Sequence, residues 1–235
     1  MHDSLRVGTV LKIDPPRNNF PLTEDAAKTV LIAGGIGITP ILSMIRRLEE
    51  LGRSWQLYYA CRSRKNAAFC RELDGFPCVT YHFSDEQGGQ RLDLAEVISG
   101  TPDDAHLYCC GPSEMLAAFE AAAKTAGKPS SHIHVEYFTQ KYETATEGGF
   151  IVELVKSGQE VAVPEGKSIL DVVRELGIDV PSSCEEGICG SCETKVISGT
   201  PDHRDAILTD DEREKSETMM ICCSGCKSER LVLDL

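Results

Sequence analysis

Two hydrophobic periods alternate along the first part of the chain. Short apolar runs, typical of buried strands, are followed by segments with apolar residues at helical spacing. This alternation over residues 29–140 predicts a parallel sheet covered by helices on both faces. The predicted strands span 29–33, 55–61 and 106–110. One predicted helix spans 41 to about 51, before Gly52, and another follows the run at 111–115 and extends to about 126.

The pattern changes after residue 139. Residues 139–149 are polar and predict a flexible tether. Residues 150–163 alternate about Ser157 and Gly158 and predict a hairpin. The last predicted elements are a helix over 169–176, capped by Ser168 and ended by Gly177, and strands at 193–197 and 231–233.

The N-terminal segment has its own pattern. Residues 5–13 predict two strands joined by a turn at Gly8, and residues 14–21 form a proline-rich connection. Two strands cannot bury a core alone, so this segment is too short to be a domain.

Composition narrows the class of protein. The 235 residues suit one large or two small domains, and no apolar run approaches the ~20 residues that span a bilayer. Eleven cysteines without a secretory signal favour a reducing cytoplasm. The net charge of −13 argues against nucleic acid or an anionic membrane as partner.

Most of the negative charge lies in the last third of the chain. Residues 149–235 carry nine Lys and Arg against eighteen Asp and Glu. An acidic face there would steer the chain toward a basic partner surface. Alternatively, the acidic run at 210–214 is simply a solvated turn or helix.

The strongest chemical signal is a set of four cysteines. Three follow the spacing C-x4-C-x2-C at Cys184, Cys189 and Cys192, and Cys222 follows far along the chain. This spacing is typical of a plant-type [2Fe–2S] cluster. A zinc site usually takes two C-x2-C pairs, and a disulfide framework requires an exported chain. By spacing alone, Cys223 and Cys226 are also candidates for the fourth ligand.

A glycine-rich turn predicts a phosphate site. Gly34, Gly35 and Gly37 follow the first strand, and Thr39 and Pro40 suit the N-cap and the first helical position. Bare N–H groups at a helix start suit a pyrophosphate. The run is not the full dinucleotide fingerprint, and a tight strand–helix turn would also explain it.

Basic and hydroxyl residues at the end of the second strand support a nucleotide site. Arg62, Ser63 and Arg64 are placed to meet a ribose or phosphate, although a solvated basic loop is the alternative. No clear acidic ribose ligand follows that strand, so the residues do not decide between NADH and NADPH.

Three polar residues share one face of the alternating segment 132–138. His132, His134 and Glu136 could bind a metal, but an exposed edge of polar side chains explains the pattern equally well.

The C-terminal region resembles a known family. Residues 149–235 are similar to the ferredoxin domain of phthalate dioxygenase reductase and its relatives, which serve Rieske-type oxygenases. The resemblance is carried by Cys-Glu-Glu-Gly-Ile-Cys-Gly-Ser-Cys-Glu-Thr (184–194), Gly-Thr-Pro-Asp-His-Arg-Asp (199–205), Met-Ile-Cys (220–222) and Leu-Val-Leu-Asp-Leu (231–235). It implies an α+β β-grasp fold of plant-type ferredoxins and assigns the fourth ligand to Cys222.

Two motifs further upstream resemble the same family. Gly-Gly-Ile-Gly-Ile-Thr-Pro (34–40) and Cys110-Gly111-Pro112 are together typical of an α/β NAD-binding domain of the ferredoxin-reductase type. The resemblance places Cys110 beside the nicotinamide and Phe138 against the flavin. Residues 2–8 and 16–22 resemble the last strands of the family's flavin barrel, most of which is absent, so the chain is expected to be a fragment that does not itself bind FMN.

The predicted organisation is therefore a barrel remnant (1–24), an NAD-binding domain (25–140), a linker (141–148) and a [2Fe–2S] ferredoxin domain (149–235). The resemblance implies a reductase that carries electrons from NADH through FMN to the cluster and on to a terminal oxygenase. Two other functions stay open: a non-enzymatic electron carrier with a docking domain, and a zinc-binding interaction module. The oxygenase and its substrate are not indicated.

Overall fold

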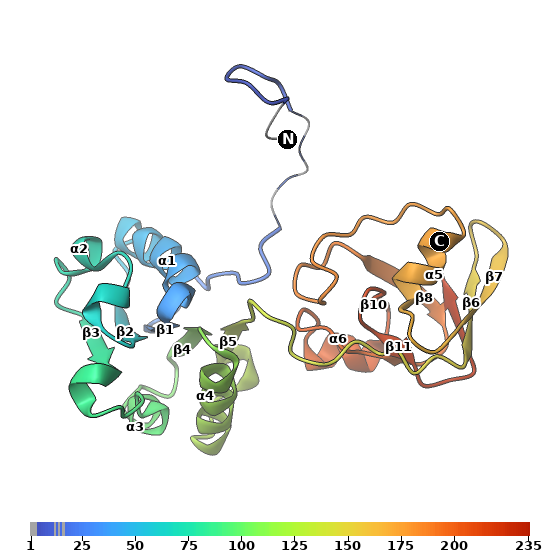
Figure 1. Ribbon diagram of the computed structural model, residues 1–235. Helices are drawn as coiled ribbons and strands as arrows, with labels where there is room; N and C mark the ends of the chain where they lie inside the picture. The colour runs from blue at the N-terminus through green and yellow to red at the C-terminus, as the bar shows by residue number, and fades with distance from the viewer. Residues whose placement is uncertain (1–3, 12, 14, 16) are drawn as a thin grey trace.

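The computed structural model describes residues 4–11, 13, 15 and 17–235. These form two five-stranded sheets in separate bodies (Figure 1), and a further two-stranded sheet lies in the C-terminal region. Residues 1–3, 12, 14 and 16, which belong to the predicted barrel remnant, lie outside the described residues. Among the described helices, none has both the length and the apolar character that crossing a membrane requires.

The first body is a five-stranded sheet in the order β3-β2-β1-β4-β5, parallel throughout. Helix α1 packs on one face, and α3 and α4 pack on the other, which confirms the predicted α/β fold. The strands are β1 (Thr29–Gly34), β2 (Trp55–Cys61), β3 (Val79–Phe83), β4 (His106–Cys110) and β5 (Ile133–Glu136), and the helices are α1 (Ile38–Glu50), α2 (Cys70–Leu73), α3 (Leu94–Ser99) and α4 (Ser113–Thr125).

The second body is a mixed sheet in the order β10-β8-β12-β6-β7 that holds helix α5 against one face. Only β12 and β6 are parallel, and the other pairs are antiparallel. This is the expected β-grasp arrangement. Its elements are β6 (Phe150–Leu154), β7 (Gln159–Val163), α5 (Ile169–Glu175), β8 (Glu193–Ser198), β9 (Pro201–Asp202), α6 (Asp210–Lys215), β10 (Thr218–Met220), β11 (Gly225–Cys226) and β12 (Arg230–Leu233).

The start of α5 follows the predicted capping pattern. The Ser168 hydroxyl accepts from the Asp171 amide at 3.1 Å, and the Asp171 carboxylate accepts from the Ser168 amide at 2.9 Å. Gly177 follows with φ of 77°, the left-handed conformation that ends helices. A capping box of this kind stabilises a helix by about 1 kcal/mol.

The start of α1 differs from the prediction. The helix begins at Ile38 rather than Ile41, directly after a 3₁₀ turn over Gly35–Gly37. Gly37 holds the N-cap position, so Thr39 lies inside the helix and donates its hydroxyl to the Ile36 carbonyl at 2.9 Å. Thr39 is therefore not the N-cap, because the 3₁₀ turn has already set helical backbone angles.

The predicted N-terminal strands do not form among the described residues. Residues 4–11 contain a turn, closed by the Thr9 amide on the Arg6 carbonyl at 3.0 Å, and no strand. Val7 and Val10 are fully exposed. An isolated strand has no partner for its backbone groups, so the alternating pattern alone does not produce one.

The predicted tether is partly attached to the second body. The Ala145 amide donates to the Cys223 carbonyl at 2.8 Å, and the Thr146 carbonyl accepts from the Gly166 amide at 2.8 Å. Ala145 is buried. The last residues of the predicted tether are therefore held rather than flexible.

His134 of β5, His132 of the 3₁₀ turn before it and His106 of β4 form a stack rather than the exposed edge that the pattern of residues 132–138 suggested. His134 lies 3.0 Å from His106 (Nε2 to Nδ1) and stacks on Tyr108 with ring centroids 4.2 Å apart. His132 stacks on His106 at 4.3 Å. The three rings are half-buried, because register brings β4 and β5 side by side.

This stack predicts acid sensitivity. Burial, and then His106 and His132, lower the pKa of His134 to about 4, against about 6.5 in the unfolded chain. The unfolded state therefore binds more protons between these values, and stability present above pH 6.5 is lost as the pH falls toward 4. Allowing for partial exposure, we expect a loss of about 1 kcal/mol at pH 5 from this group.

Urea unfolding at pH 7.5 and pH 5 measures the loss. The His134→Phe variant keeps an aromatic ring against Tyr108 but cannot titrate, so its free energy of unfolding should fall less between the two pH values. An equal fall in both proteins would contradict the assignment.

Candidate functional site

Three of the predicted cluster cysteines lie on an irregular loop between α5 and β8. Gly187 and Gly190 take φ of 70° and 72° there, a backbone conformation that favours glycine. The loop cysteines Cys184 and Cys189 are partly exposed, whereas Cys192 and Cys222 are buried.

The four predicted ligand thiols influence one another. The pKa of the Cys189 thiol responds to Cys184, and the pKa of the Cys192 thiol responds to Cys222 and, more weakly, to Cys189. Backbone amides also point at sulfur: the Glu186 amide donates to Cys184 at 3.4 Å, and the Ser191 amide donates to Cys189 at 3.5 Å. The loop thus brings the four residues together and offers hydrogen bonds that favour thiolates.

The thiols have different proton affinities. Burial alone would raise the pKa of Cys189, but hydrogen bonds from Ser191 and the Cys184 backbone outweigh it and lower the pKa to about 7. Cys192 has a raised pKa, chiefly through its hydrogen bond with Cys222. The same bond lowers the pKa of Cys222, but contact with Cys223 and burial raise it to about 12. Of these three thiols, Cys189 would therefore lose its proton first.

The donor set has the composition that a two-iron cluster requires. A [2Fe–2S] cluster divides four thiolates between two irons. The four thiols and the amides aimed at sulfur match that requirement.

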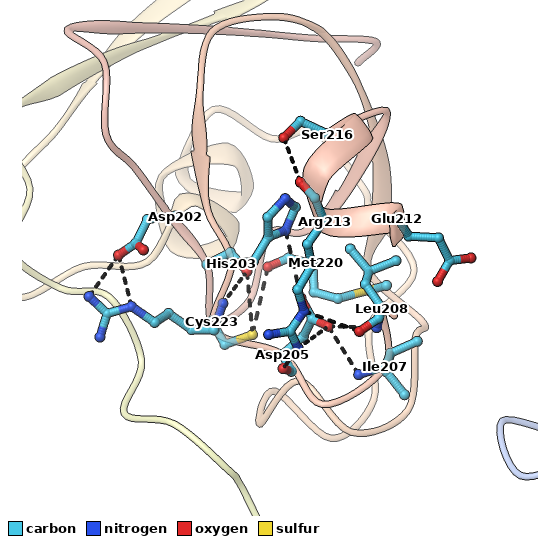
Figure 2. A network of polar contacts seen from close by, with 12 residues as sticks. Asp202, His203, Asp205, Ile207, Leu208, Glu212, Arg213, Ser216, Met220 and Cys223 are labelled. Atoms are coloured by element: carbon cyan, nitrogen blue, oxygen red, sulfur yellow. Dashed lines mark hydrogen bonds and ion pairs between the residues drawn. The ribbon is translucent and has the colours of Figure 1, made fainter. Parts of the chain in front are cut away.

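A buried carboxylate supports the loop from behind (Figure 2). Asp205 is fully buried and accepts from the Ile207 and Leu208 amides at 3.0 and 2.8 Å. The next amide, of Ala206, donates to the Gly187 carbonyl at 2.9 Å. A Cβ at Gly187 would lie 2.5 Å from the Cys223 sulfur, so the loop packs directly on this support.

The sequence interpretation gave Asp205 no role. Its only signal was its place in the family motif at 199–205. The neighbouring His203 completes the network: both ring nitrogens are buried without a hydrogen-bond partner, and Nδ1 lies 3.8 Å from Asp205 Oδ1.

The glycine-rich turn packs against the end of β4. A Cβ at Gly37 would lie 2.1 Å from the Cys110 carbonyl oxygen, and one at Gly34 would lie 2.7 Å from Pro112. Only glycine lets these two turns approach at the point where the strand order reverses. In open α/β sheets, ligands bind at this point.

A cavity of about 480 Å³ opens beside the turn. Four predicted residues line it, namely Gly34, Gly35, Arg62 and Pro112. Gly37, Thr39, Pro40, Ser63, Cys110, Gly111 and Phe138 do not. The sequence interpretation missed Asn66, His82, Ser84, Arg91, Leu92 and Glu114, which reach the cavity from the ends of β2 and β3, the segment before α3 and the first turn of α4.

The predicted nicotinamide end of the nucleotide site lies on the β4 side of β1. Cys110 is fully buried, and its thiol contacts the Glu136 carboxylate at 3.8 Å. Burial, and then Glu136, raise the pKa of Cys110 to about 12, so the thiol is neutral at physiological pH. Phe138 is 41% exposed and offers an open aromatic face. Cys109 is also buried, in the core beneath α4.

A second cavity of about 610 Å³ lies between the N-terminal segment and the cluster loop. Pro15, Arg17 and Asn19 line one side, and Cys189 and its neighbours line the other. The Asn19 amide donates to the Cys189 carbonyl at 3.3 Å.

Two family models match the chain. Residues 31–121 match the oxidoreductase NAD-binding domain, and residues 152–227 match the 2Fe-2S iron-sulfur cluster binding domain. The chain is 51% identical, over its whole length and 73% of the relative's, to the phenoxybenzoate dioxygenase subunit beta of Ectopseudomonas oleovorans.

Solved structures agree with these matches. An intact type IV self-sufficient cytochrome P450 monooxygenase matches with a TM-score of 0.84 and 39% identity, covering 100% of this chain and 31% of that one. Phthalate dioxygenase reductase, described as a modular structure for electron transfer from pyridine nucleotides to [2Fe-2S], matches with a TM-score of 0.58 and 41% identity, covering 93% and 68%. The chain belongs to the phthalate dioxygenase reductase-like family of oxygenase reductase components.

Proposed function

We propose that this chain is the electron-transferring part of a Rieske-type oxygenase reductase, using NADH as donor and a [2Fe–2S] cluster as relay. The observation that carries the proposal is the gathering of Cys222 with Cys184, Cys189 and Cys192 at a loop whose backbone amides donate to the Cys184 and Cys189 sulfurs. Nicotinamides give up two electrons as hydride and such clusters accept one, so a flavin is the usual device between them.

The chain's own residues would divide the work as follows. The turn after β1 presents backbone N–H groups to the pyrophosphate, and the first cavity holds the adenosine half. Cys110 stays protonated beside the nicotinamide and contributes packing rather than base catalysis, because its pKa is about 12.

The exposed thiol pair marks the face where electrons enter or leave. Cys184 and Cys189 are partly exposed, whereas Cys192 and Cys222 are buried. The second cavity lies against Cys189, and residues of the segment that resembles the family's flavin barrel line it. A flavin supplied there, FMN by the family resemblance, would lie beside the exposed side of the cluster.

We propose Cys222 rather than Cys223 or Cys226 as the fourth ligand. Cys222 is the thiol that interacts with Cys192, whereas Cys223 bonds back to the Met220 carbonyl at 3.8 Å and packs on Gly187. Cys226 bonds to the Ser228 carbonyl at 3.1 Å, beside β11.

The proposed partner is a terminal oxygenase. We expect the two proteins to interact in a reducing compartment. All eleven cysteines are unpaired, in keeping with such a compartment. The acidic helix α6, whose first turn holds Asp210, Asp211 and Glu212, gives the second body a negative face that suits a basic docking surface.

The electron-carrier alternative and the reductase predict different responses to NADH. An anaerobic mixture of protein, NADH and free FMN separates the two functions: we expect the cluster's visible absorbance to bleach with both added and to persist with NADH alone. A cluster that dithionite bleaches but NADH with FMN does not would favour the carrier.

The ligand assignment has its own test in three cysteine variants. Cys222→Ser should lose at least about tenfold in iron and acid-labile sulfide after anaerobic reconstitution, because a hydroxyl is a poor substitute for a thiolate in these clusters. Cys223→Ser and Cys226→Ser should keep nearly the full content and the visible spectrum. Loss of the cluster from Cys223→Ser but not from Cys222→Ser would overturn the assignment.

A further inference from the structure

The first cavity lies at the adenosine end of the nucleotide site. Its lining runs from Gly34 and Gly35 at the end of β1 to His82 and Ser84 at the end of β3, and it also includes Pro112 and the first residues of α4. In doubly wound sheets this half holds the adenine ribose, near the end of the second strand. NADPH differs from NADH only by a phosphate on that ribose, so this cavity is where the two donors are told apart.

Two cationic side chains line the cavity, and both are already paired. Arg91 Nη1 lies 2.5 Å from the Glu114 carboxylate, and Arg62 Nε lies 3.5 Å from Asp85. Glu114 comes from the first turn of α4, so its pair with Arg91 joins opposite sides of the opening. The four head groups together carry no net charge.

The remaining arginine of that loop is also engaged. Arg64 lies 2.6 Å from Asp74 and sits over the Tyr81 ring at 5.1 Å. It does not line the cavity. Both arginines of the basic run are thus paired with carboxylates within the protein.

A ribose 2′-phosphate needs an arginine with free donors. It would carry close to two negative charges, and an arginine nearby is what accommodates it in NADP-binding sites. In this cavity the 2′-phosphate would have to displace a carboxylate from its arginine and then remain beside that carboxylate. Exposed ion pairs are individually weak, so the penalty comes mainly from the charge that stays close by.

Resting on the nucleotide site proposed above, we propose that Glu114 and Asp85 are specificity-determining residues. By occupying Arg91 and Arg62, they favour a donor with a free ribose 2′-hydroxyl over one with a 2′-phosphate. A 2′-hydroxyl is neutral and can bond to the same head groups without breaking either pair.

Calorimetric titration of the full chain with two probes tests this proposal without turnover. The probes are 5′-AMP and adenosine 2′,5′-bisphosphate, and the quantity compared is the ratio of their affinities. In the unaltered chain the bisphosphate should bind no more tightly than AMP. Glu114→Gln and Asp85→Asn should each shift the ratio about tenfold toward the bisphosphate, since each removes one repelling charge.

Two further variants identify the cause. Glu72→Gln makes the same charge change at an exposed pair with Arg46, 2.8 Å apart and outside the cavity, so it should move the ratio less than twofold. Adding Arg91→Gln to Glu114→Gln should remove the gain, because the freed arginine is what would receive the phosphate.

The outcomes are distinguishable. A ratio unchanged in Glu114→Gln and Asp85→Asn, or changed equally in Glu72→Gln, would overturn this inference while leaving the nucleotide site intact. A clear preference of the unaltered chain for the bisphosphate would also overturn it. Absence of binding by both probes at millimolar concentration would overturn the donor site itself, and the inference with it.

Discussion

The buried carboxylate of Asp205 is the contact on which the shape of the cluster loop depends. A carboxylate without solvent is costly unless it is paired. Oδ2 of Asp205 accepts from the Ile207 and Leu208 amides and lies 3.6 Å from the Arg213 guanidinium, whereas Oδ1 has no hydrogen-bond partner among the described residues, so the chain must stay where these groups reach Oδ2. Ala206, held between Asp205 and Ile207, bonds to the Gly187 carbonyl. The position of the loop that brings the thiols together is therefore set by a residue that itself binds no cofactor.

In the nucleotide-binding half, close packing rather than a buried charge fixes the position of the site. Its two turns share space that no side chain could enter, since a Cβ at Gly37 would collide with the Cys110 backbone. The close approach fixes the end of β4 relative to the start of α1. In both halves an unreactive contact places the reactive groups, by hydrogen bonding in one and by steric exclusion in the other.

Local patterns were enough to predict most elements, because strand and helix periods and the Ser168 cap depend on residues close in sequence. What the pattern could not predict depended on tertiary contact. Thr39 failed as a cap because the preceding 3₁₀ turn changed where α1 begins. The His106–His134 contact depends on the register of β4 and β5, and Asp205 acquires its role only through burial. The cysteine spacing succeeded because it is itself the requirement of the cluster.

Charge acts over different distances in the two halves of the chain. Residues 149–235 carry eighteen acidic against nine basic residues, a field that can orient a partner during encounter without any one residue being placed accurately. Such a field fades over about 8 Å in physiological salt, so it cannot decide whether one phosphate fits a cavity. That decision depends on the carboxylates that touch Arg62 and Arg91. Composition can therefore indicate the class of partner, whereas the choice of donor is readable only once the folded chain has brought Glu114 to Arg91 from elements that are distant in sequence.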